Sequence, residues 1–415
     1  MSFSSAAQSR TLVQHRAEVI AGLRPLPPLD VLVADATGAT LVGDVVARHA
    51  LPATDVAMCD GYAVQAADVA EASDENPISL TVSHDVSFDA RAPRRHIRGA
   101  AARISSGAPL PIGADAVVPV AATDGGVARV RIMAPTHTQA NIRTAGDEAA
   151  AGALAIAQGS RLDARRIALA AALGNARLTV SPVPRVVVIS VGSELEEPGA
   201  GRPGSRVPES NAYMLSALVR EAGANAYRVG VVADDRGSVR ATIEDQLVRA
   251  DVVLITGGLS EARNDTVAAV LQDLGDVRVG EVGLWPGKRH GYGLVSADGE
   301  HPIPVLALPG SPTAALVAFE AYVRPALRVM SGRTEVDRPT IHARSIASWR
   351  SLEGQVQPVP VTIETTGSGQ HFATPVGIPG EISLTNVVAS DALAWVDSEV
   401  AHVTRGDSLR CTLWD

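Results

Sequence analysis

Three short apolar runs, each leading into glycine and small polar residues, organise the middle of the chain. They span residues 185–195, 251–260 and 304–312. Continuous apolar runs of this length are typical of strands that are buried on both faces of a parallel sheet. The segments between them, such as 211–222 and 238–248, have helix-like patterns. This alternation predicts βαβ units, whose ligands bind at the carboxyl ends of the strands.

The pattern changes on both sides of this region. Residues 11–23 have apolar positions at helical spacing, and a proline-rich turn at 25–28 stops the helix. Residues 78–120 alternate as in strands, interrupted by proline and glycine, which predicts a small β-rich module. Residues 162–173 again have a helical pattern, and the short Val and Thr segments after residue 332 predict an all-β C-terminal domain.

Composition narrows the class of protein. The chain has 415 residues, of which 46% are hydrophobic, so it is long enough for several domains with their own cores. The formal net charge of −9 and an aromatic content of 3% disfavour nucleic acid and anionic membranes as partners. The two cysteines have no metal-site spacing, and no signal pattern or apolar stretch of membrane length occurs, so we expect a cytoplasmic protein.

The glycine turns that follow the three apolar runs form a candidate ligand site. Gly192, the pair Gly257-Gly258 and Gly310 would let the backbone approach an anion closely, and the helices that follow offer free N–H groups. One such turn alone is more simply a tight connection between strand and helix. Three together, with Glu194 and Asp265 close by, favour a ligand site. None of them matches a dinucleotide fingerprint or an NTPase P-loop.

Motifs along almost the whole chain resemble those of one family. The sequence Asp-Gly-Tyr-Ala occurs at 60–63, Ser-Gly-Ala-Pro-Leu-Pro at 106–111 and Pro-Gly-Ser-Pro at 309–312. Further matching stretches are 41–64, 104–118, 141–152, 185–199, 209–211, 230–235, 251–265, 286–288, 307–312 and 403–413. In order and spacing the chain is similar to the molybdopterin molybdenumtransferases, the last-step enzymes of molybdenum cofactor assembly that are homologous to the gephyrin E domain.

This resemblance implies a multidomain α/β and β fold with an elongated subunit. Its central three-layer αβα domain is similar to the molybdopterin adenylyltransferases. We expect an N-terminal discontinuous domain (1–50 plus 147–181), an inserted β-rich domain (51–146), a molybdopterin-binding α/β domain (182–332) and a C-terminal β domain (333–415). The family also implies a homodimer, with the active cleft between the α/β domain and domains of the partner subunit.

The implied reaction takes adenylylated molybdopterin and molybdate, releases AMP and leaves molybdenum on the dithiolene, with Mg²⁺ assisting. A molybdopterin adenylyltransferase or a target molybdoenzyme is a candidate partner. By resemblance, the catalytic positions are Asp60, Ser106, Asp235 and Lys288. The substrate-binding positions are Arg143, Gly192, Asn211, Gly257, Gly258, Ser260, Pro309, Gly310 and Ser311. The metal ligands are Glu194 and Asp265, since a hard cation that bridges phosphate oxygens needs one or two carboxylates.

Several departures from the family pattern fall in these motifs. The family's Lys-Pro-Gly-Lys-Pro is here Trp285-Pro-Gly-Lys-Arg289, and the family's glycine and acid before Asp265 are Ala262 and Arg263. Because molybdate is a dianion, the loss of a lysine weakens its pocket. Two alternatives therefore stay open: a paralogue that binds or delivers the pterin or the cofactor, and a variant that uses another oxyanion such as tungstate. Residue by residue, Asp60 as a turn residue, Arg143 in a surface ion pair and Trp285 as a packing residue are the simpler interpretations.

Overall fold

A computed structural model describes residues 9–89, 93–199, 206–259, 265–296 and 301–414. The chain divides into two compact units. The first comprises residues 1–30, 38–42 and 179–415, and the second comprises residues 31–37 and 43–178. Each is described by itself below. Within the described residues, no helix is both long enough and apolar enough to cross a membrane.

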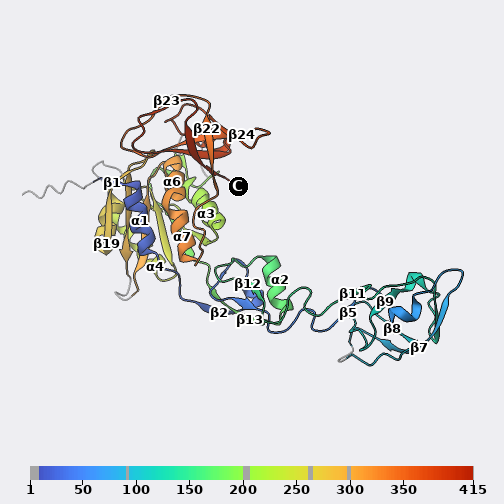
Figure 1. The fold of residues 1–415 in the computed structure, drawn as a ribbon. Coiled ribbons are helices and arrows are strands. Elements are labelled where there is room, and N and C mark those ends of the chain that lie inside the picture. The colour runs from blue at the N-terminus through green and yellow to red at the C-terminus, as the bar shows by residue number, and fades with distance from the viewer. Residues whose placement is uncertain (1–8, 90–92, 200–205, 260–264, 297–300, 415) are drawn as a thin grey trace, which may run out of the picture. The chain divides into compact units, whose positions relative to one another are not determined.

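A seven-stranded sheet of described residues forms the centre of the first unit (Figure 1). Its order is β1-β19-β20-β21-β18-β14-β17. The strands are β1 (Arg10–Thr11), β19 (Gly275–Gly283), β20 (Arg289–Val295), β21 (Ile303–Leu308), β18 (Val252–Thr256), β14 (Arg185–Ser190) and β17 (Asn225–Arg228). Strands β21, β18, β14 and β17 are parallel, and β20 is antiparallel to both of its neighbours. The three apolar runs are therefore β14, β18 and β21, as predicted.

Helices cover both faces of this sheet. The helices are α1 (Leu12–Gly22), α3 (Asn211–Ala222), α4 (Arg236–Leu247), α5 (Thr266–Leu274), α6 (Pro312–Ala318) and α7 (Arg324–Met330), with the π-helical turn η4 (Phe319–Val323) between the last two. Val186 and Val188 of β14 belong to a core with α1, α3, α6 and α7, whereas Val187 and Ile189 belong to a core with α4 and α5. Successive strand residues thus enter opposite cores, which explains the continuous apolar run. The predicted αβα layering is confirmed.

A closed β-barrel follows within the same unit (Figure 1). Its order is β22-β25-β24-β26-β28. The strands are β22 (Thr340–Ser345), β25 (His371–Pro375), β24 (Gln357–Thr365), β26 (Ala392–Val396) and β28 (Ser408–Leu413), joined by β23 (Trp349–Arg350), β27 (His402–Val403) and the helix α8 (Leu384–Val388). Small residues such as Ala343, Ala373, Ala392 and Ala394 fill its interior around Trp349. This agrees with the predicted all-β C-terminal part.

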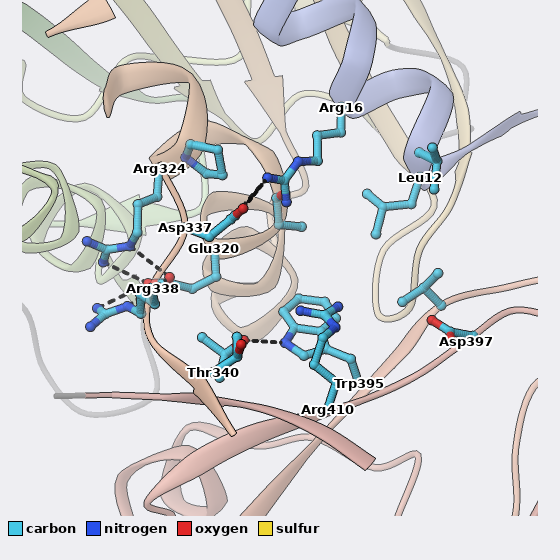
Figure 2. Close-up of a pocket in the computed structure, with 15 residues that line it drawn as sticks. Leu12, Arg16, Glu320, Arg324, Asp337, Arg338, Thr340, Trp395, Asp397 and Arg410 are labelled. Atoms are coloured by element: carbon cyan, nitrogen blue, oxygen red, sulfur yellow. Dashed lines mark hydrogen bonds and ion pairs between the residues drawn. The ribbon is translucent and has the colours of Figure 1, made fainter. Parts of the chain in front are cut away.

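An ionic cluster of Glu320, Arg324 and Arg338 joins the helical layer to the segment that enters the barrel (Figure 2). Glu221, whose side chain is 54% exposed, pairs with both arginines. Arg324 and Glu320 are 2.8 Å apart, and the side chain of each is only 1% exposed. Arg338 bonds both glutamates and the carbonyl oxygen of Trp414. A cavity of about 150 Å³ lies beside the cluster, and its lining includes none of the predicted site residues.

The second unit is rich in short strands, as predicted for its central part. One sheet has the order β10-β7-β8-β6-β9, and the pairs β11-β5 and β12-β4 form small ladders. The strands are β4 (Val45–Val46), β5 (Val56–Ala57), β6 (Gly61–Val64), β7 (Ile78–Val86), β8 (Ala100–Ile104), β9 (Ala116–Pro119), β10 (Arg129–Ile132), β11 (Ile142–Arg143) and β12 (Leu154–Ile156). The helix α2 (Ala164–Ala172) begins at its cap Asp163. Strands β2 (Leu29–Leu32), β13 (Arg177–Ser181) and β3 (Thr40–Leu41) form a further sheet. In the first unit, β15 (Leu195–Glu196) pairs with β16 (Val207–Pro208).

Candidate functional site

The glycine turns lie together at the carboxyl edge of the parallel strands. Gly257 follows β18 with φ +90°, and a Cβ atom there would meet the carbonyl oxygen of Val191, which follows β14, at 2.1 Å. A Cβ atom on Gly310, after β21, would lie 3.4 Å from Cα of Gly257. Only glycine can combine this conformation with this close approach. Three strands that are distant in sequence therefore end at one rim.

A cavity of about 130 Å³ opens at this rim. Glu194, Asn211, Gly257 and Gly310 line it, together with residues of β15, β16 and the strand ends. Four of the predicted positions therefore share one hollow, although they come from four separate segments. Of the other positions predicted in this unit, Pro309 and Ser311 flank Gly310, and Ser260 lies outside the described residues.

Asn211 holds the rim together. Its Nδ2 donates to Oγ1 of Thr256 at 2.9 Å and to the carbonyl oxygen of Gly310 at 2.7 Å. Thr256 in turn donates to the carbonyl oxygen of Pro309 at 3.0 Å. Both side chains are buried, so each bond is protected from exchange with water. As the first residue of α3, Asn211 thereby fixes the turn after β21 against the end of β18.

Glu209 is a rim residue that the sequence did not single out. It is 2% exposed, and its Oε1 accepts from Oγ of Ser190 and from the backbone N–H of Ala212, both at 2.8 Å. Its Oε2 and the Oδ1 of Asn211 are buried without a partner in the described residues. Buried acceptors normally have donors, and both residues line the cavity. The signal was present in Glu-Ser-Asn at 209–211, where only Asn211 was assigned a role.

Two adjacent acids before α4 have different surroundings. Asp235, the predicted catalytic residue, is exposed and caps the helix, where its carboxylate accepts from the N–H of Ser238 at 2.9 Å. Such bonds hold the pKa of the Asp235 carboxyl below its usual value. Asp234 is half-buried, its N–H donates to Oγ of Ser193 at 3.0 Å, and its Oδ1 is buried with no partner among the described residues. The acid next to the rim is therefore Asp234, which no motif in the sequence had indicated.

Asp265, a predicted metal ligand, caps α5 and forms an ion pair with Arg289. Its Oδ1 accepts from the N–H of Ala268 at 3.3 Å, and its Oδ2 contacts Nη2 of Arg289. Burial raises the pKa of the Asp265 carboxyl, the positive charge of Arg289 opposes this rise, and the charge of Asp234 adds to it. The negative charge of Asp234 therefore acts on Asp265, and the guanidinium of Arg289 supplies the positive charge that neutralises Asp265.

The turn that carries Lys288 is fixed from three sides. The backbone N–H of Trp285 donates to the carbonyl oxygen of Val356 at 2.9 Å, and its indole Nε1 donates to that of Gly380 at 2.9 Å. A Cβ atom on Gly287 (φ +80°) would meet the side chains of Ala314 and Pro309 at 2.7 and 2.8 Å. Lys288 itself is exposed. Trp285 therefore fastens this turn to the barrel through two hydrogen bonds.

His290 supports the same turn from inside the core. Its ring lies 2.8 Å from the carbonyl oxygen of Gly287 through Nε2 and 2.9 Å from the hydroxyl of Tyr322 through Nδ1. A carbonyl oxygen only accepts, so Nε2 carries the proton and Nδ1 accepts from Tyr322. Burial lowers the pKa of His290 to about 4 and that of His15, which packs on the same tyrosine, to about 3. Both rings are neutral at physiological pH.

The predicted residues of the second unit lie on exposed surface. The backbone N–H of Ser106 donates to Oδ1 of Asp60 at 2.7 Å, and its hydroxyl donates to the carbonyl oxygen of Met58 at 3.3 Å. Arg143 forms an ion pair with Glu148 at 2.6 Å, as in its simpler interpretation. The structure thus brings Asp60 and Ser106 together, and Asp60 orders the turn that contains the serine.

The rim does not fit a divalent cation shared by Glu194 and Asp265. No group of three or more His, Cys, Asp or Glu side chains that could hold a metal occurs in the described part of the chain. Both oxygens of Asp265 are engaged, one by the helix cap and one by Arg289. Glu194 forms no ion pair with any described residue, so it is the rim carboxylate open to a cation that accompanies a phosphorylated ligand.

Comparison with known proteins covers both units. Residues 5–174 match the family described as MoeA N-terminal region (domain I and II), and residues 187–329 match the probable molybdopterin binding domain. Molybdopterin molybdenumtransferase 1 of Mycobacterium tuberculosis is 34% identical, over 96% of this chain and 97% of that protein. Molybdopterin molybdenumtransferase 2 of the same organism is 35% identical, over 98% and 99%. A molybdopterin biosynthesis moeA protein from Pyrococcus horikoshii superposes with a TM-score of 0.77 at 28% identity, covering 98% of this chain and 100% of that structure.

Proposed function

The chain belongs to the molybdopterin molybdenumtransferase family, and we propose on this premise that it inserts molybdate into adenylylated molybdopterin with release of AMP. One observation supports this function most directly. The glycine turns after β14, β18 and β21, two acids and a buried amide meet around one cavity at the carboxyl edge of the sheet. That edge is where parallel α/β sheets bind phosphorylated ligands.

The glycine turns are suited to the diphosphate of the substrate. Without side chains at Gly257 and Gly310, which line the cavity, phosphate oxygens can reach backbone N–H groups. Gly192 instead makes room for the carboxylate of Glu194. The N-terminus of α6, which begins with Pro312 after the cap Ser311, adds a positive dipole end. Asn211 keeps these turns in register. Its role is therefore to preorganise donors rather than to react.

The pterin end of the substrate carries N–H donors, and the cavity offers buried acceptors to them. Oε2 of Glu209 and Oδ1 of Asn211 lack partners among the described residues. A ligand without such donors would leave both acceptors buried and unsatisfied, at a cost of about 1 to 3 kcal/mol each. This pairing would select a pterin over other diphosphate compounds.

Proton transfer at the rim is assigned to Asp234 in place of Asp235. The Oδ1 atom of Asp234 has no hydrogen-bond partner among the described residues, whereas Asp235 is engaged in capping α4. Lys288, exposed on a turn that is braced on both sides, supplies positive charge to the molybdate dianion. A magnesium ion would be held by Glu194, where it would neutralise phosphate charge.

Three further features are inferred from the family. We propose a homodimer, a cytoplasmic location, and participation of Asp60, Ser106 and Arg143 in the same reaction. The bond between Ser106 and Asp60 supports a defined role for that turn. The four-domain division, 1–50 with 147–181, 51–146, 182–332 and 333–415, is likewise proposed.

Release of AMP on addition of molybdate to the purified protein and adenylylated molybdopterin tests this function. We expect steady AMP production, and restoration of nitrate reductase activity in a strain that lacks the transferase. Folded protein that binds the pterin by calorimetry but produces no AMP would refute the activity, and would favour a binding or delivery role. Tungstate in place of molybdate in the same assay reports the choice of oxyanion.

A further inference from the structure

The ion pair between Arg289 and Asp265 places a positive charge of the chain at the rim. Arg289 is the first residue of β20 and lies opposite Glu281 of β19. Its guanidinium nevertheless pairs with Asp265, the cap of α5, which comes from a different segment. The two side chains are 31% and 20% exposed, so water only partly screens the pair.

Both oxygens of Asp265 already contact groups of the chain while this pair exists. Its Oδ1 accepts from the N–H of Ala268, and its Oδ2 contacts the guanidinium. Mg²⁺ requires near-octahedral oxygen ligands at short distances. A cation at this carboxylate would have to displace Arg289, or share the carboxylate with it at the cost of repulsion between two positive charges.

Arg289 keeps donors available for an anion. A guanidinium has five N–H groups in a fixed planar fork, and the pair with Asp265 uses Nη2. The Nε atom is buried and has no acceptor among the described residues. A buried donor without a partner indicates a missing acceptor. Phosphate oxygens match that donor in charge and in geometry.

We propose that Arg289, fixed on Asp265, supplies to the substrate's diphosphate the positive charge that a divalent cation on this carboxylate would supply. The diphosphate half of this inference rests on the proposed function. The other half, that Arg289 keeps metal ions away from Asp265, concerns the protein alone.

Binding of Mn²⁺ to the full-length protein without nucleotide tests the second half, because free Mn²⁺ has a distinct paramagnetic resonance spectrum. We expect Arg289→Met to bind Mn²⁺ about tenfold more tightly than the unmodified protein or tighter, since repulsion is removed. Arg289→Lys, which keeps a cation near Asp265, should stay close to the unmodified protein. Arg289→Met combined with Asp265→Asn should lose the gain.

Two further variants serve as controls for the Mn²⁺ experiment. Arg289→Gln, neutral but polar, replaces Arg289→Met if that variant does not fold. Arg228→Met is the matched control, because Arg228 is 30% exposed and pairs with Glu197 elsewhere in the unit. An unchanged Mn²⁺ affinity in folded neutral variants of Arg289, or a gain that survives Asp265→Asn, would overturn the proposal.

The apparent affinity for adenylylated molybdopterin at saturating magnesium tests whether Arg289 supplies charge to the diphosphate. Arg289→Met should weaken it about tenfold or more, and Arg289→Lys less, because lysine keeps the charge but lacks the fork. Equal affinity in all three proteins would overturn this half. Failure of the transferase activity is distinguishable, since AMP release would then be absent from the unmodified protein while the Mn²⁺ result stands.

Discussion

The indole Nε1 of Trp285 donates to the carbonyl oxygen of Gly380 across 2.9 Å, and so ties the Lys288 turn of the α/β layer to a loop of the C-terminal barrel. The backbone of Trp285 bonds Val356 at the same junction. A residue that departs from the family pattern therefore has a defined mechanical role. A lysine at this position has no indole N–H and could not make this hydrogen bond to Gly380 in the same way.

Trp285→Phe should remove this bond while keeping an aromatic ring. We expect the free energy of unfolding to fall by about 1 kcal/mol, and the KM for molybdate to rise more than kcat falls, because Lys288 is no longer held from the barrel side. Urea unfolding and initial AMP-release rates measure the two effects. Trp349→Phe is the control, since Nε1 of Trp349 has no partner in the described residues. Equal KM values in the two variants would contradict the role of Trp285.

Acid should destabilise the protein through His15 and His290. Their folded-state pKa values are lowered to about 3 and about 4, below the usual histidine value of 6.5. The unfolded chain therefore takes up protons first, and stability is present above pH 6.5 and lost as the pH falls from 6.5 toward 4. At about 1.4 kcal/mol per pKa unit, His290 alone accounts for roughly 3 kcal/mol.

Replacement of His290 by Phe should reduce this acid sensitivity, because the substituted ring does not titrate. Thermal unfolding between pH 4 and pH 7.5 measures the difference. His371→Phe, which removes an exposed hydrogen bond in the barrel, is the matched control. Identical slopes for the parent and His290→Phe would contradict the assignment.

Asn211 variants test how the rim is held. Asn211→Ala removes two hydrogen bonds and should cost about 1 to 3 kcal/mol of stability. Asn211→Asp keeps the shape but places a carboxylate beside the carbonyl oxygen of Gly310 and the phosphate site. It should weaken substrate binding more than alanine does, because it adds repulsion to the lost donor. Calorimetric titration with adenylylated molybdopterin ranks the two, and tighter binding by the aspartate variant would contradict this account.

The adjacent acids Asp234 and Asp235 form an internal control. Asp234→Asn should lower the rate of AMP release by about a hundredfold, the usual range for an acid–base residue. Asp235→Asn should change that rate little and stability by about half a kcal/mol or less, since asparagine is an equally good N-cap. The reverse order of effects on the rate would restore Asp235 to the catalytic position.

Alanine variants of Gly257 and Gly230 test whether the close backbone contact at the rim requires glycine. Gly257→Ala would place Cβ 2.1 Å from the carbonyl oxygen of Val191 at a φ of +90°, so we expect a loss of about 3 kcal/mol or more. Gly230→Ala meets nothing within 4 Å and should be nearly neutral. Denaturant midpoints compare them, and similar values would show that the rim adapts to a side chain.

The pattern of apolar and polar residues along the chain was enough to predict the central sheet. β14, β18 and β21 are buried on both faces, so almost every residue in them is apolar, and 211–222 coincides with α3. The predicted helix at 238–248 begins two residues earlier, because Asp235 caps it. Parallel strands end at one edge, which is why the glycine turns could be grouped before their geometry was known.

Side-chain direction could not be predicted in the same way. Asp234 and Asp235 are chemically identical neighbours, and only the capping geometry decides which one faces the rim. Arg289 and His290 are adjacent in the sequence, yet one reaches α5 and the other points into the core. These choices depend on contacts between segments that lie far apart in the sequence.

The edge strand β1 links the beginning of the chain to a much later segment. Arg10 pairs with Val282, and Thr11 pairs with Gly283. During synthesis at 5 to 20 residues per second, these partners leave the ribosome roughly 14 to 54 seconds apart. Helix α1, which packs His15 against His290 and Tyr322, must wait equally long for its core. The nascent N-terminal segment therefore exposes its apolar face without a core until residues 282–322 have left the ribosome.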